Sequence, residues 1–139
     1  SCQNLGGAAN GLNKTITEVE YIINPKLIKK FEARKRAMMK KNKCGEKGLN
    51  IILAWHGTKS GNVQNITDNN FSLAKLAANT GNKGYYGCGV YFSEFAKVSN
   101  AYGDGLLLCK VILGKQYQMN AGNSQMGRQL EAGHDSHVV

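Results

Sequence analysis

The chain has 139 residues, of which 42% are hydrophobic and 19% are charged, and its formal net charge is +9 at pH 7. This length predicts one domain, and the charge is expected to attract nucleic acid, an acidic protein or an anionic cofactor. The scattered cysteines and the lack of a long apolar run argue against a zinc site, a disulfide framework and a membrane span. We therefore expect an intracellular protein, nuclear or cytoplasmic.

The first predicted elements are a strand and a basic helix. Residues 1–16 are rich in Gly, Ala and Asn and predict a flexible lead-in, and residues 17–23 alternate polar and apolar side chains as a half-buried strand does. Asn24 is a typical N-cap before a helix over residues 25–41. That helix could lie against a phosphate backbone. The favoured interpretation is simpler, with one apolar face buried and the lysines in solvent.

A short apolar run with β-branched residues predicts a buried strand over residues 49–55. The strand delivers His56-Gly57-Thr58, and a polar helix is expected over residues 60–68. Residues 69–86 are dominated by Asn, Gly and Tyr and predict a loop.

The second half of the chain predicts a strand over residues 89–92 and a helix over residues 94–102, capped by Ser93. A strongly apolar strand follows over residues 106–113, and residues 116–119 are expected to continue the sheet. The last twenty residues predict irregular structure. Short strands mixed irregularly with helices indicate the α+β class.

Three motifs in a fixed order carry most of the functional information. They are Leu53-Ala54-Trp55-His56-Gly57-Thr58, Gly87-Cys88-Gly89-Val90-Tyr91-Phe92-Ser93-Glu94 and Ser99-Asn100-Ala101-Tyr102. Each motif alone is weak, because a lone histidine after a strand or a tyrosine in a strand is usually a packing residue. Together they resemble the catalytic domain of the poly(ADP-ribose) polymerase family, the diphtheria-toxin-like ADP-ribosyltransferases.

The resemblance implies the ADP-ribosyltransferase fold, a split antiparallel β-sheet core with flanking helices. The catalytic domain would occupy residues 17–139 and would be incomplete at its C-terminus. Residues 20–31 and 106–115 are similar to the family's opening strand and helix and to a later strand. Gly133-His134-Asp135-Ser136 is similar to a loop before the last family motif. A polar surface loop explains His134 and His137 better than a metal pair.

The resemblance also implies NAD⁺ as the substrate, no metal, and transfer of ADP-ribose to a protein, including the chain itself, or to a nucleic acid. It implies that the Gly57 backbone and the Ser99 hydroxyl bind the nicotinamide carboxamide, and that Tyr91 and Tyr102 flank its ring. His56 would bind the adenine-side ribose. Residues near that ribose and the pyrophosphate would be Thr58 and Asn62. Residues 72–86, with Lys75 and Lys83, would cover the donor.

In this family the catalytic triad is a histidine, a tyrosine and a glutamate, and the first two match His56 and Tyr91. The glutamate follows the Asp-Ser loop, whereas Glu131 precedes that loop and the sequence reaches only Val139. We favour the hypothesis that the third residue lies beyond the chain over the hypothesis that the protein lacks it. The short loop over residues 72–86 favours the branches of the family that transfer single ADP-ribose units. The alternatives are a catalytically inactive NAD⁺-binding or interaction module on this fold, and a basic nucleic-acid-binding domain.

Overall fold

The structure, a computed structural model, describes residues 14–75 and 84–139. Most of the expected lead-in and Lys83 lie outside the described residues. The chain divides into two compact units. The first unit consists of the described residues of Ser1–Lys30, Leu53–Asn70 and Tyr91–Val111. The second unit consists of the described residues of Phe31–Ile52, Phe71–Val90 and Ile112–Val139.

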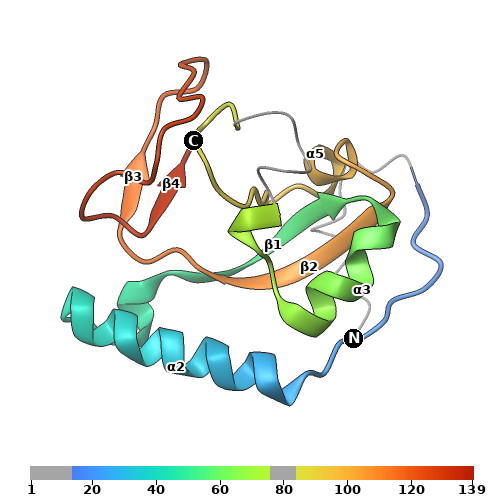
Figure 1. The fold of residues 1–139 in the computed structure, drawn as a ribbon, viewed down its shortest axis with the longest axis horizontal. Coiled ribbons are helices and arrows are strands. Elements are labelled where there is room, and N and C mark those ends of the chain that lie inside the picture. The colour runs from blue at the N-terminus through green and yellow to red at the C-terminus, as the bar shows by residue number, and fades with distance from the viewer. Residues whose placement is uncertain (1–13, 76–83) are drawn as a thin grey trace. The chain divides into compact units, whose positions relative to one another are not determined.

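Helix α2, Pro25–Asn42, confirms the predicted basic helix (Figure 1). The Asn24 side-chain oxygen accepts hydrogen bonds from the N–H groups of Lys26, at 3.1 Å, and Leu27, at 3.3 Å. Because the first N–H groups of a helix have no partner within it, this side chain fixes where α2 begins. Met38 is buried on one side of α2, whereas the lysines and arginines are mostly exposed.

The strand predicted over residues 17–23 is wrong. Residues 15–24 form no regular element, and Tyr21 and Ile23 are 82% and 80% exposed. A strand is stable only when its backbone groups pair with a neighbour. None of the strands in the described ranges pairs with this segment. The alternating pattern is therefore present without a sheet.

The strand predicted over residues 49–55 is shifted toward the C-terminus. Leu49 lies in the 3-10 helix η2, Glu46–Leu49, and is completely buried. Asn50 then takes a left-handed conformation, with φ at 50°, which ends the turn. Strand β1, Ile51–Thr58, therefore begins later than predicted and includes the His56-Gly57-Thr58 motif instead of ending before it.

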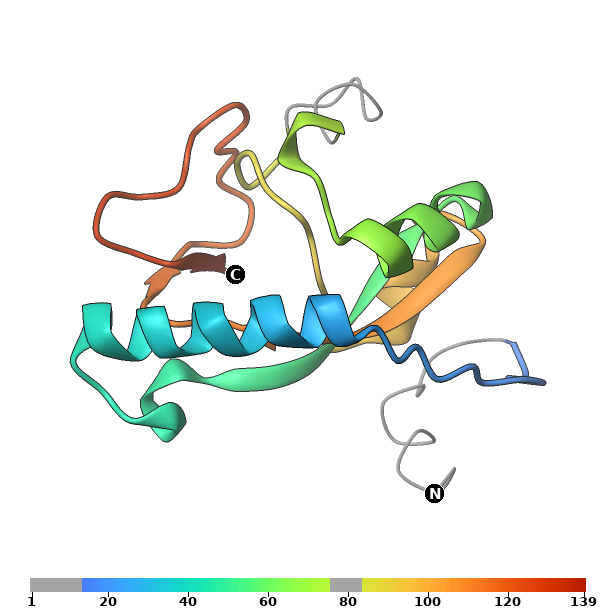
Figure 2. The same ribbon diagram turned by 60° about the horizontal axis from the view of Figure 1, so that its bottom comes forward.

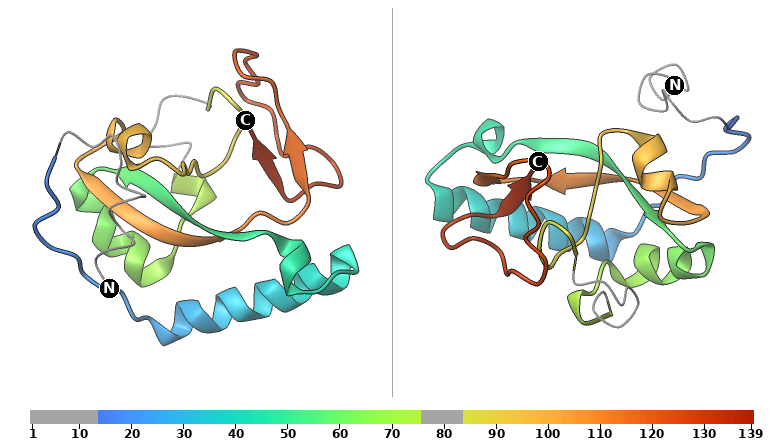
Figure 3. Two further views of the ribbon diagram at one scale, coloured as in Figure 1. Left: turned by 180° about the vertical axis from the view of Figure 1, so that it is seen from behind. Right: turned by 90° about the horizontal axis from the view of Figure 1, so that it is seen from above.

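Within residues 14–75 and 84–139, two separate two-stranded sheets confirm the α+β class and the split sheet. Strand β2, Gly105–Ile112, lies beside β1 (Figures 1 and 3). Gly105 approaches Thr58, while the N–H of Leu113 donates to Asn50, so β1 and β2 run antiparallel.

The second sheet pairs β3, Gln116–Gln118, with β4, Ser136–Val138, in parallel. The sequence predicted β3 but assigned the residues of β4 to irregular structure. Three residues carry too little periodic pattern to indicate a strand. Pairing with a segment twenty positions earlier makes these residues a strand.

The remaining helices are close to their predicted positions. Helix α3, Ser60–Asn69, confirms the polar helix. In the predicted loop 69–86, residues 73–75 are helical, and residues 76–83 lie outside the described ranges. Helix α5, Ala96–Asn100, is shorter than the predicted helix 94–102, and its N-cap is Phe95, so the predicted cap at Ser93 is wrong. The described helices include none that is both long and apolar enough to cross a membrane.

Residues 89–92 do not form the predicted strand. Only Ser93 pairs with β1, through an isolated antiparallel bridge to Trp55. The carbonyl group of Tyr91 instead contacts the ring of His56. Since Ser93 is held extended by its bridge, α5 can begin only after it, and the Ser93 hydroxyl oxygen accepts from the N–H of Phe95 at 3.0 Å.

Candidate active site

The strand β1 carries the first motif on a buried anchor in the first unit. Ala54 and Trp55 are 1% and 6% exposed. The N–H of Trp55 donates to the Ser93 carbonyl at 2.8 Å, and the N–H of Ser93 donates to the Trp55 carbonyl at 2.9 Å. This double hydrogen bond fixes the second motif beside the first, so residues thirty-five or more positions apart in the sequence become neighbours.

The His56 ring is held by the backbone of the second motif. Its Nδ1 lies 2.9 Å from the carbonyl oxygen of Tyr91. A carbonyl oxygen only accepts hydrogen bonds, so Nδ1 carries the proton in this contact. The ring of Phe92 packs against the imidazole with centroids 5.5 Å apart. The structure thus brings His56 and Tyr91 together, through the ring of one residue and the main chain of the other.

Gly57 lies where the third motif packs against β1. A Cβ atom at this position would overlap the backbone carbonyl oxygen of Ser99, so only glycine allows α5 to approach so closely. Ser99 is 3% exposed, and its hydroxyl donates to the Trp55 carbonyl at 2.9 Å. Ser99 is therefore part of the contact that holds α5 on β1.

The backbone groups of Gly57 point to the same edge of β1 as those of Trp55, because N–H and C=O directions alternate along a strand. That edge faces the second motif, and the pairing there is a single bridge that ends at Trp55 and Ser93. Gly57 therefore follows the last bridged residue on this edge. In the described residues, the isolated bridge on this edge does not extend to Gly57.

Exposed aromatic and aliphatic side chains lie in and between the second and third motifs. Tyr102 is 70% exposed, and Tyr91 is 37% exposed. Tyr102 lies in the turn after α5, where its N–H donates to the Ser99 carbonyl at 3.0 Å. Phe95 and Val98 are exposed as well. A flat apolar ligand could therefore contact several side chains of the first unit without displacing its core.

Thr58 and Asn62 contact each other at the start of α3. The side-chain amide of Asn62 donates to the Thr58 hydroxyl oxygen at 3.2 Å. Asp104, which the sequence analysis missed, accepts from the N–H of Ser60 at 2.8 Å. This backbone hydrogen bond, the largest influence, lowers the pKa of Asp104. A Gly-Asp-Gly turn was the only signal in the sequence, because the capped helix begins 44 positions earlier.

The loop residue Asp135 has a different role, within the second unit. Its carboxylate is 3% exposed and lies 2.7 Å from the ammonium group of Lys41. It also accepts from the side chain of Asn42, at 2.8 Å, and from the N–H of Lys115, at 2.9 Å. Burial alone would raise the pKa of Asp135, but these hydrogen bonds and the Lys41 charge outweigh it and hold the pKa at about 2.

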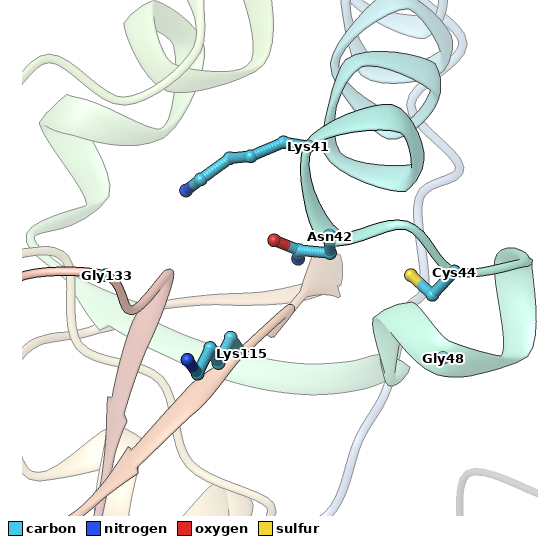
Figure 4. Close-up of a pocket in the computed structure, with 6 residues that line it drawn as sticks. All are labelled: Lys41, Asn42, Cys44, Gly48, Lys115 and Gly133. Carbon is cyan, nitrogen blue, oxygen red and sulfur yellow. The ribbon is translucent and has the colours of Figure 1, made fainter.

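A pocket of the second unit lies beside this carboxylate (Figure 4). Figure 4 shows Lys41 and Asn42 at the end of α2 and Lys115 beside them. Because the Lys41 ammonium group is paired with Asp135, this polar network joins segments of the second unit. The pocket is lined by Lys41, Asn42, Cys44, Gly48, Lys115 and Gly133.

The two late histidines occupy structural positions. Nε2 of His137 accepts from the N–H of Glu131 at 3.0 Å, and its Nδ1 lies 3.2 Å from the Tyr86 carbonyl oxygen. His134 packs edge-on against Tyr117. Within the described residues, no group of three or more His, Cys, Asp or Glu side chains could hold a metal ion.

Residues 1–138 match the family model described as the poly(ADP-ribose) polymerase catalytic domain. The match spans all but the last residue of the chain and so includes the three motifs and the Asp135 loop. No curated protein matches the chain.

Proposed function

Because the chain belongs to the poly(ADP-ribose) polymerase catalytic-domain family, we propose that it transfers ADP-ribose from NAD⁺ to an acceptor and releases nicotinamide. The observation that carries the proposal is the backbone of Gly57, which follows the last bridged residue on one edge of β1. The acceptor is a protein, including the chain itself, or a nucleic acid.

The chemistry of the nicotinamide group of NAD⁺ fits the edge of β1 at Gly57. The carboxamide of nicotinamide has a carbonyl acceptor and an N–H donor, like the side chain of Gln. The N–H of Gly57 would donate to the carbonyl, and the Gly57 carbonyl would accept from the amide. The exposed rings of Tyr91 and Tyr102 would stack on the nicotinamide ring.

The remaining proposed contacts with NAD⁺ involve residues in or near β1. His56 would bind a hydroxyl of the adenine-side ribose, and its ring is already oriented by the Tyr91 carbonyl. Thr58 and Asn62 would lie near that ribose and the pyrophosphate. Ser99 has a single O–H donor, which now goes to Trp55. To donate to the carboxamide, this hydroxyl would have to rotate away from the Trp55 carbonyl.

In the reaction, the bond between the nicotinamide nitrogen and C1′ of the ribose breaks, and nicotinamide keeps the bonding electron pair. The acceptor atom forms the new bond to C1′ and loses its proton. By resemblance, a glutamate after the Asp135-Ser136 loop would stabilise the positive charge that develops on the sugar. Glu131 does not take this part in our proposal, because its side chain lies 3.7 Å from Arg128 and its N–H donates to His137.

A thermal shift with benzamide, a mimic of nicotinamide, tests the pocket. We expect the melting temperature to rise with benzamide concentration. Tyr102→Ala should weaken benzamide binding by about 1–3 kcal/mol, the scale measured for aromatic stacking. Tyr21→Ala is the matched control, since Tyr21 is also an exposed tyrosine of the first unit but lies outside the motifs.

The outcomes separate binding from catalysis. No rise in melting temperature of the folded chain, or an equal loss in both variants, would contradict the proposed pocket. If benzamide binds as expected, transfer of labelled ADP-ribose from NAD⁺ is measured with the chain extended beyond Val139. Binding of NAD⁺ without transfer in that protein would favour the inactive module.

A further inference from the structure

One side of α2 carries seven exposed basic residues, one of which, Lys41, is paired with Asp135. At about 100° per residue, these side chains fall within an arc of about 160° around the helix axis. Figure 2 shows α2 as one unbroken helix, so the residues form a continuous row. We call the six residues on this side that make no ion pair within the described ranges the basic face: Lys26, Lys29, Lys30, Arg34, Arg36 and Lys40.

The acidic residues near α2 do not neutralise the basic face. Glu32 and Glu46 both pair with Lys35, at 2.8 Å and 3.1 Å. The Lys35 side chain is only 13% exposed and points away from the basic face, whose residues follow the opposite side of the helix. Across the described ranges, the ion pairs of α2 are made by Lys35 and Lys41, and none involves the basic face.

The stability of the helix does not explain this composition. Lys26, Lys30 and Arg34 follow one another at intervals of four residues, where like charges repel. The first turn of α2 contains no acidic residue, although its partial positive charge favours one. Each of these choices opposes folding of the helix, so a partner that neutralises the charge would account for them better.

The shape of the basic face suits a long anion. Its centre is occupied by Ala33 and Ala37, both exposed. These small side chains leave a shallow strip between the basic residues along which an extended backbone can approach. The charged row from Lys26 to Lys40 is about 21 Å long at the helical rise per residue. One strand of a DNA duplex presents about six phosphates over that length.

From this row of charges we infer that α2 is a docking surface for the phosphate backbone of nucleic acid, bound without regard to base sequence. An acidic protein fits less well, because protein interfaces rely on buried aromatic or aliphatic anchors and the basic face offers none. The inference does not depend on NAD⁺ or on the transfer reaction, since α2 carries none of the three motifs.

The test measures binding of the chain to a fluorescent DNA duplex of about 20 base pairs, by anisotropy, at several salt concentrations. The triple variant Lys26→Gln, Lys30→Gln, Lys40→Gln removes three charges that lie within about 40° of the middle of the arc, including both ends of the row. The control triple Lys47→Gln, Lys59→Gln, Lys97→Gln removes three exposed charges elsewhere. Both variants have the same net charge, and circular dichroism verifies that α2 remains helical.

We expect the first triple variant to bind about tenfold or more weakly and to lower the salt slope, log Kd against log salt, by about three. The control triple should keep the slope and affinity within about twofold. Equal losses in the two variants would overturn the inference, because net charge alone would then explain binding. Equally tight binding of poly-glutamate would also overturn it, in favour of an acidic protein partner.

Discussion

At the end of β1, the side chains of His56 and Ser99 are held by backbone carbonyl groups, at 2.9 Å in each case. In the second unit, the carboxylate of Asp135 instead gathers three donors from two segments of the chain, the end of α2 and Lys115. The first arrangement positions side chains with the main chain of neighbouring motifs. The second joins segments of the main chain with one buried side chain.

This difference separates residues that serve binding from residues that serve stability. Tyr102 is 70% exposed and Tyr91 is 37% exposed, so truncating these side chains should disturb the core less than removing a buried one. Asp135 is buried and fully engaged, and removing it would leave donors without a partner. Substitution of the exposed tyrosines should therefore change affinity, whereas substitution of Asp135 should change the free energy of unfolding.

At Gly57 a substitution should change both stability and ligand binding, and we expect its effect on the free energy of unfolding to be the largest. In Gly57→Ala the new methyl group would overlap the Ser99 backbone carbonyl, which cannot rotate away as a side chain would. We expect a loss of about 3 kcal/mol or more in the free energy of unfolding, measured with urea, together with loss of benzamide binding.

Gly89→Ala is the matched control, because no atom lies within 4 Å of a Cβ at Gly89. It should leave stability within about 0.5 kcal/mol. A Gly57→Ala protein as stable as the control would show that α5 does not pack on β1 as described. A stable variant that lost only benzamide binding would assign Gly57 to the ligand alone.

Asp135→Ala should have the next largest effect. The side chain of Asn42 and the N–H of Lys115 would lose their acceptor, which costs about 1–3 kcal/mol in the free energy of unfolding. Benzamide affinity should stay unchanged. Asp68→Ala, at an exposed aspartate of the first unit, serves as the control and should cost less than about 0.5 kcal/mol. Equal stability of the two variants would refute the role given to the buried carboxylate.

Local signals in the sequence were enough to predict several helices and strands. Asn24 followed by Pro25 marks the start of α2, because a cap and a fixed φ act on adjacent residues. The apolar run of β2 was equally clear, and its predicted range differs from the observed one by a single residue at each end. The ordered motifs predicted the family, which the match over residues 1–138 confirms.

Features that depend on distant partners could not be read from the sequence. Residues 17–23 show the alternation of polar and apolar side chains that is typical of a strand, but they have no strand beside them in the described part of the chain. Strand β4 exists through its pairing with β3, and the donors of Asp135 come from positions up to 94 residues away. The hydrogen bond from Ser99 to Trp55 likewise spans 44 positions. The roles of the site residues toward NAD⁺ stay predictions.

The comparison between the two regions also predicts how stability depends on pH. The pKa of Asp135 is held at about 2, below its ordinary value of 3.8. A carboxyl group whose pKa is lower in the folded state stabilises the fold above its unfolded pKa. That stabilisation is lost as the pH falls from about 4 toward 2, where the folded protein takes up the proton.

Asp104 tests whether burial makes the difference, since its pKa is lowered too but it caps α3 from an exposed position in the first unit. In urea unfolding, the native protein should lose free energy of unfolding between about pH 5 and pH 2. Asp135→Asn should reduce this loss by about 1 kcal/mol. The effect is this small because solvent screens the exposed Lys41 partner. Asp104→Asn should change the pH profile less. If Asp104→Asn removed more of the acid sensitivity than Asp135→Asn, the exposed cap would be the stronger interaction, and the stabilising role would belong to the first unit instead of the second.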